Sequence, residues 1–237
     1  MMKNILKITT VSIILFSALT FINYEAKAQY LPVGPQVNVP QSTVTNGGWV
    51  ECYRDTYDNF MNADEVLANC PGDRLMLACK PVGSQTLMLL AQGERSDVTF
   101  NTGNDNNDVT HIANGVGWYF NNDGIMGEEE GDAWGFVRAG DSVAKNNCDV
   151  DSSGANNERL CWHLQEDVGG YRCGSIGNDE GDLNEGPEAM AYERIVYMPG
   201  SIAPTEVPTL SQWGLIAMAG VLGVVGFMVM RRKRATA

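Results

Sequence analysis

Two apolar segments, one near each end of the chain, limit the part of the sequence that can fold as a globular domain. The first runs from about Ile8 to Ile22, behind Lys3 and Lys7, and the second runs from Gly214 to Met230. Neither segment contains an acidic or basic residue. Long uncharged apolar runs are typical of segments that meet a membrane, so we expect the globular structure to lie between them.

The N-terminal segment has the layout of a secretory signal peptide. A basic start and an apolar stretch are followed by the small residues Ala26 and Ala28, at the two positions that signal peptidase reads. We predict removal of residues 1–28 by signal peptidase, so that the mature protein is exported and begins at Gln29. The alternative is a signal anchor that is retained.

The C-terminal segment is predicted to be one transmembrane helix over residues 214–230. Seventeen residues span roughly 25 Å as a helix, enough for a thin hydrocarbon core if the flanking residues help. Residues 231–237 form a basic tail that the positive-inside rule leaves in the cytoplasm. The cluster that stops the segment is Arg231, Arg232, Lys233 and Arg234.

A short motif in the linker of residues 201–213 continues into the helix. Its residues are Val207, Pro208, Thr209, Leu210, Trp213 and Gly214. With the apolar run and basic cluster behind it, the motif resembles the IPTL-CTERM protein sorting domain of Gram-negative bacteria, although Val207 stands where that family usually has Ile.

The resemblance implies that a membrane-embedded exosortase, a cysteine-type processing enzyme, cuts near the motif and passes the protein to the cell surface. The protein would then be anchored in the inner membrane before processing, and lie in the envelope, on the surface or outside the cell afterwards. An ordinary single-pass anchor with a juxtamembrane linker is the alternative.

The segment between the two ends is strongly acidic. Residues 29–203 carry nine Lys and Arg against 27 Asp and Glu, a net charge of −18. Such a charge repels nucleic acid and anionic membranes, so nucleic-acid binding is excluded. Residues 29–46 are rich in Pro, Val and Gln and are predicted to be an extended lead-in, followed by one domain over residues 47–200.

All six cysteines lie in this domain, at Cys52, Cys70, Cys79, Cys148, Cys161 and Cys173. An even number of cysteines in an exported chain indicates three disulfides. The sequence leaves the pairing open, but two groups of three require at least one bond between the halves of the domain. A metal site made of these cysteines is disfavoured, because the chain has no CxxC motif and only two histidines.

The domain is predicted to be all-β, a disulfide-stapled sandwich or barrel of about eight strands. Short apolar or alternating runs rich in aromatic and β-branched residues are separated by Gly, Asn and Asp. Gly83 is available for a hairpin turn, and residues 58–70 are predicted to hold one short helix. The strand candidates are residues 48–57, 73–81, 85–94, 117–121, 133–141, 159–165, 170–174 and 192–199.

Loops rich in Asp, Asn, Glu and Gly make calcium the candidate ion. In the run DVDSSG, Asp149, Asp151 and Ser153 occupy the first, third and fifth positions of an EF-hand loop, but the twelfth position is Leu160 instead of Glu. A looser calcium loop at these three residues is the first choice, and residues 128–130 with Asp132 are the second. The alternative is that the loops are ordinary solvated turns.

Aromatic residues in the later half give a hint of a ligand. Flat rings beside polar loops are typical of sugar-binding surfaces, and the candidates are Trp118, Tyr119, Trp134, Trp162 and His163. The stronger interpretation places the three tryptophans in the core. In residues 159–165, alternation puts Leu160 and Trp162 on one face and Cys161 and His163 on the other, so both faces can be buried only if the strand is covered on both sides.

We therefore expect a binding or structural module rather than an enzyme, with extracellular polysaccharide as the candidate partner. The sequence has no GxSxG, HExxH, phosphate-binding or dinucleotide-binding motif. The alternative is a secreted hydrolase acting on a polysaccharide or an ester, built around His111 or His163 and one of the many acids.

Overall fold

A computed structural model describes residues 29–59, 61–103, 108–122, 133–145, 148–149, 156–164, 170–178 and 189–200, with single positions at 216, 220 and 224. The predicted cleavage site at Ala26 and Ala28, the sorting motif and the basic cluster of residues 231–234 lie outside these residues, as do all but three positions of the predicted transmembrane helix. Within the described ranges, no helix is both long enough and apolar enough to cross a membrane.

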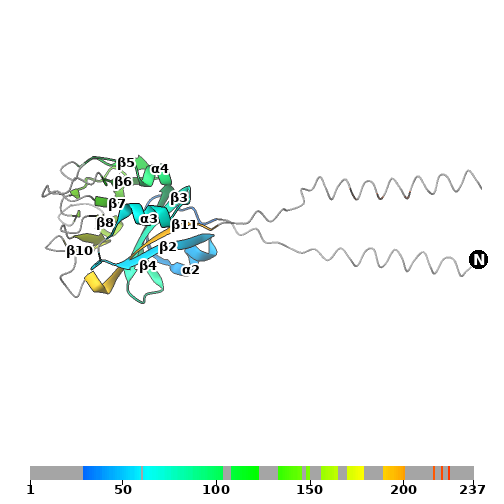
Figure 1. Ribbon diagram of the computed structural model, residues 1–237, viewed down its shortest axis with the longest axis horizontal. Helices are drawn as coiled ribbons and strands as arrows, with labels where there is room; N and C mark the ends of the chain where they lie inside the picture. Colours follow the sequence, from blue (N-terminus) through cyan, green and yellow to red (C-terminus); the bar gives the residue numbers. More distant parts are fainter. Residues whose placement is uncertain are drawn as a thin grey trace, which may run out of the picture.

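The domain consists of two antiparallel sheets that pack face to face (Figure 1). Sheet A has the strand order β1 (Gln36–Pro40), β4 (Thr86–Glu94), β3 (Arg74–Pro81), β11 (Tyr192–Pro199), β2 (Trp49–Thr56). Sheet B has the order β10 (Ile176–Asn178), β9 (Tyr171–Cys173), β8 (Leu160–His163), β7 (Ala133–Arg138), β6 (Val116–Phe120), β5 (His111–Ala113). The expectation of a mainly β fold is confirmed, and its form is a sandwich.

Each of the eight predicted runs overlaps one strand, and β1, β5 and β10 are additional. The β3–β4 hairpin turns at Gly83, whose φ of 78° is a conformation that glycine adopts without strain. The predicted helix appears as α3 (Ala63–Asn69), where the Asn62 side chain accepts a hydrogen bond from the Glu65 backbone N–H, 3.1 Å away. The other helices are short: α2 (Gln41–Asn46), α4 (Arg95–Val98), η2 (Asn156–Glu158) and η3 (Ala189–Ala191).

The main core lies between the sheets and is rich in aromatic rings. Trp134 lies edge-on to both Phe120 and Trp162, with ring centroids 5.3 and 5.7 Å apart. Sheet A contributes Leu75, Leu77 and other residues at alternate positions of its strands to the same cluster. Because apolar residues of both sheets meet here, the two sheets stabilise each other.

Both sheets are also covered on their outer faces. On sheet A, Val44 of α2 packs with Trp49 and with residues on the outer face of β3, β4 and β11. On sheet B, Val143 and Cys148 pack over Tyr119 and Cys161. Both faces of β8 are therefore buried, because the strand is covered on both sides, as the alternation of residues 159–165 requires.

The lead-in is part of the fold, so the predicted boundary at residue 47 is too late. Its residues form β1, which pairs with β4 at an edge of sheet A, and α2, which covers the outer face of that sheet. Pro35, Pro40 and Asn38, whose φ is 55°, interrupt the regular strand pattern. Prolines and irregularities are typical of edge strands, where they limit pairing with other chains.

The six cysteines form three disulfides: Cys52–Cys70, Cys79–Cys173 and Cys148–Cys161. The expectation that at least one bond joins the two halves is confirmed by Cys79–Cys173, which connects β3 of sheet A to β9 of sheet B. The two other bonds close loops of 18 and 13 residues. The long-range bond therefore holds the two layers of the sandwich together.

Candidate functional site

A polar pocket of about 400 Å³ lies where α2 meets the outer face of sheet A. Its lining comes from α2, β2, β3 and the β3–β4 turn. The alternation of side chains along β2 and β3 directs one lining residue of each strand to this face. The lining residues are Gln41, Ser42, Thr45, Arg54, Lys80 and Gln85.

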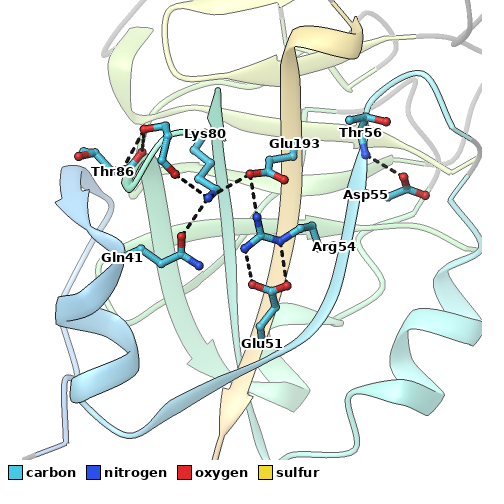
Figure 2. Close-up of polar contacts among 9 residues, drawn as sticks. Gln41, Glu51, Arg54, Asp55, Thr56, Lys80, Thr86 and Glu193 are labelled. Carbon is cyan, nitrogen blue, oxygen red and sulfur yellow. Dashed lines mark hydrogen bonds and ion pairs between the residues drawn. The ribbon is translucent and has the colours of Figure 1, made fainter. Parts of the chain in front are cut away.

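Lys80 lies at the inner side of this pocket and is only 2% exposed. Its ammonium group donates to Gln41 Oε1 at 2.9 Å and to the Ser84 carbonyl oxygen at 2.7 Å, and it lies 3.0 Å from Glu193 Oε1 (Figure 2). Three partners match the three N–H donors of an ammonium group. The buried charge is therefore compensated within the fold.

Arg54 completes the network from β2, which lies on the other side of β11 from β3. Its Nη1 donates to Glu193 Oε1 at 2.9 Å, and its Nε and Nη2 donate to the two oxygens of Glu51 at 2.8 and 2.5 Å (Figure 2). Hydrogen bonding to Glu51 raises the pKa of Arg54. Glu193 thus bridges two cations, and the two bases and two carboxylates of the network balance in charge.

The aromatic residues predicted to bind a ligand lie elsewhere and are buried. Trp118, Tyr119, Trp134, Trp162 and His163 are all 0 or 1% exposed. The core interpretation of the tryptophans is confirmed, and the surface interpretation of the five residues is wrong, because buried rings cannot stack on a sugar.

The polar atoms of several of these rings have partners inside the protein. Tyr119 donates its hydroxyl to the Leu160 carbonyl oxygen at 2.8 Å, and Trp162 donates to the Tyr57 hydroxyl at 3.0 Å. Trp134 Nε1 donates to the Val98 carbonyl oxygen at 3.1 Å. Such bonds allow amphipathic rings to be buried at low cost.

Asp149, the first of the predicted calcium ligands, is committed to an ion pair. Its Oδ2 lies 2.5 Å from Arg159 Nη1, its Oδ1 accepts from the Ala144 N–H at 3.1 Å, and both charged side chains are fully buried. A guanidinium at this distance repels a cation, so the assignment of Asp149 to calcium is wrong. Asp151, Ser153 and the second-choice acids, residues 128–130 with Asp132, lie outside the described residues.

Of the two histidines proposed for a hydrolase, His111 has an acidic partner. Its Nε2 lies 2.8 Å from Asp97 Oδ1, and its ring stacks on Phe100 with centroids 4.4 Å apart. In the part of the chain that the structure describes, no serine or threonine hydroxyl hydrogen-bonds to His111. His163 lies with Cys148 and Cys161, whose sulfur atoms are joined in a disulfide and are therefore not free to bind a metal.

Sequence reasoning missed the pocket. Lys80 and Arg54 were part of predicted strands, and the pocket depends on α2, which was expected to be extended. One signal could have found it: only nine basic residues occur in residues 29–203, and Lys80 follows an apolar run whose alternation places it with Met76 and Ala78. A lysine on a covered face needs compensating partners.

Comparison with known families gives one match: the model for the IPTL-CTERM motif matches residues 207–234. The C-terminal resemblance is therefore confirmed, and it implies processing by an exosortase-type enzyme. No curated protein and no solved structure matches the chain.

Proposed function

We propose that this protein is delivered to the cell surface through its IPTL-CTERM signal and acts there as a non-catalytic module that binds a neutral polysaccharide. The observation that supports delivery is the motif at residues 207–234. The three disulfides fit the same destination, because such bonds persist in oxidising compartments outside the cytoplasm.

The binding role is supported by the chemistry of the pocket. Gln41 and Gln85 offer side-chain amides, Ser42 and Thr45 offer hydroxyls, and Arg54 has N–H groups beyond those bonded to Glu51 and Glu193. Sugar hydroxyls both donate and accept, so they can use such a set. The pocket network balances in charge, and the net charge of −18 over residues 29–203 disfavours an acidic polymer, so the neutral sugar is the better fit.

The test is retention on a glycan array and on polysaccharide from the host's extracellular matrix. The Ser42→Tyr variant places a bulky ring in the pocket without removing a partner of Lys80, and we expect it to lose binding at least tenfold. Thr43→Tyr is the matched control, since Thr43 is exposed on the same helix but does not line the pocket. Equal binding by both variants would show that the polysaccharide does not bind in this pocket.

A hydrolase is the second candidate, and the Asp97–His111 pair is the observation that favours it. A histidine oriented by a carboxylate can act as a general base. This alternative predicts turnover on a panel of polysaccharides and esters that His111→Gln abolishes. Absence of turnover by the natural protein, together with glycan retention, supports the binding module.

A further inference from the structure

The two ends of the described domain meet at one end of the sandwich. The Gly200 N–H donates to the Gly48 carbonyl oxygen at 2.8 Å, and the Tyr30 N–H donates to the Gly47 carbonyl oxygen at 3.0 Å. Trp49 Nε1 also donates to the Tyr30 carbonyl oxygen at 2.6 Å. The beginning of the domain and the end of β11 therefore lie side by side (Figure 1).

We name this region the tail pole and define it as residues 29–34, 47–50 and 198–200. It contains no charged residue. All nine bases and 27 acids of residues 29–203 lie outside its three segments. The adjoining ends of β3 and β4 bring two acids and two bases, whose charges cancel: Asp73, Arg74, Glu94 and Arg95. The tail pole is thus neutral in a strongly acidic domain.

The tail pole also exposes aliphatic side chains. Leu31 is 45% exposed, Val33 is 71% exposed and Val50 is 45% exposed. Single exposed aliphatics are common on proteins, but these three occur on uncharged segments at the point where the chain leaves the domain. Apolar side chains without nearby net charge suit contact with a lipid surface.

The length of chain beyond Gly200 keeps this surface near the membrane. Six residues separate Gly200 from the motif at residue 207, and they reach at most about 20 Å when extended. If the segment behind the motif enters the bilayer, the tail pole is the end of the domain that faces it. The acidic remainder then points away, where anionic headgroups do not repel it.

We propose that the tail pole lies against the lipid surface while the sorting tail is uncut, and that cutting the tail releases it. This inference rests on the proposed delivery route. Three aliphatic side chains give a weak contact, but tethering raises the effective concentration of the pole at the membrane. Once the tether is cut, that advantage is lost and the domain can leave.

The test uses residues 29–237, the chain without its predicted signal peptide, in phosphatidylcholine vesicles, with quenching of tryptophan fluorescence by brominated lipid. Leu31→Trp adds a reporter at the tail pole. Val82→Trp is the matched control, because Val82 is 52% exposed in the β3–β4 hairpin at the opposite end of sheet A. Relative to the natural chain, we expect additional quenching for Leu31→Trp and none for Val82→Trp.

Trp213 separates the inference from the delivery route on which it rests. Loss of quenching in Trp213→Phe shows that the tail enters the bilayer. If Trp213 is quenched but Leu31→Trp and Val82→Trp show the same additional quenching, the lipid contact of the tail pole is overturned and the membrane route stands. Absence of any Trp213 quenching would overturn both the membrane route and the contact.

Discussion

At the scale of residues, the acidic domain buries a close pair of opposite charges. Asp149 and Arg159 are both fully buried and lie 2.5 Å apart, while Arg172 Nη1 donates to the Asp149 carbonyl oxygen at 2.6 Å. Removing one member of a buried pair leaves the other charge without compensation. Charge pairing and hydrogen bonds therefore hold Asp149 in place.

We predict that Asp149→Ala lowers the free energy of unfolding by about 3–5 kcal/mol, because the buried Arg159 loses its close carboxylate partner and keeps only Asp141, 3.6 Å away. The control is Glu158→Gln, which breaks the partly exposed pair with Arg138 and costs less than about 1 kcal/mol. Urea unfolding monitored by circular dichroism measures both. Similar losses for the two variants would show that the buried pair has no special role.

Buried tyrosines predict a loss of stability at alkaline pH. Burial raises the pKa of Tyr57, Tyr119 and Tyr197 in the folded state. In the unfolded chain these phenols ionise near pH of about 10, so above that pH the unfolded state binds fewer protons and stability falls as pH rises. Below that pH the contribution to stability is fully present.

Urea midpoints measured between about pH 8 and about pH 11 should therefore decrease at the alkaline end, and phenolate absorbance of the buried tyrosines should rise together with unfolding. Gradual ionisation of every tyrosine without unfolding would contradict the burial of these three rings.

At the scale of elements, the disulfide Cys79–Cys173 has the greatest effect on the two-sheet arrangement. It closes a span of 94 residues, whereas Cys52–Cys70 closes 18. In the chain-entropy model, the longer loop contributes about 4–5 kcal/mol and the shorter about 3 kcal/mol.

We predict that Cys79→Ala with Cys173→Ala lowers the free energy of unfolding more than Cys52→Ala with Cys70→Ala does. Urea unfolding of the two double variants under non-reducing conditions measures the difference. The reverse order would show that strain or residual structure, rather than loop closure, decides how much each bond stabilises the fold.

Strand periodicity and turn residues were enough to locate eight strands, the β3–β4 hairpin and α3 from the sequence. They missed β5 and β10, because three residues carry almost no periodicity. They also missed β1 and α2, whose residues are rich in Pro, Gln and Thr and are ordered by pairing with β4 and by packing on sheet A. Tertiary contacts therefore decide these elements.

The candidate site was less predictable than the fold. Alternation placed Trp162 and His163 on opposite faces of β8, but it could not show that Val143 and Cys148 cover the second face. Likewise, the position of Lys80 beside Gln41 depends on residues 39 positions apart in sequence. Which elements cover a strand, and which distant residues contact it, are properties of the folded chain. The residue pattern of one strand does not contain this information.

At the scale of the whole molecule, both ends of an acidic, disulfide-bonded sandwich leave from one uncharged pole. The polar pocket lies on sheet A beside α2, with Lys80 and Glu193 near the end of the strands opposite that pole. A domain held by the tail pole would therefore keep this pocket away from its attachment. This arrangement fits a surface module that is held at one end and binds with another face.

The central claim is that the chain is exported, oxidised and cut at both ends before it works. Intact-mass analysis of the protein recovered from the surface of its native host tests this most directly. We predict a chain that begins at Gln29, ends near the motif of residues 207–214, and shows six cysteines in three disulfides. A full-length chain with free thiols, recovered from the cytosol, would contradict the claim.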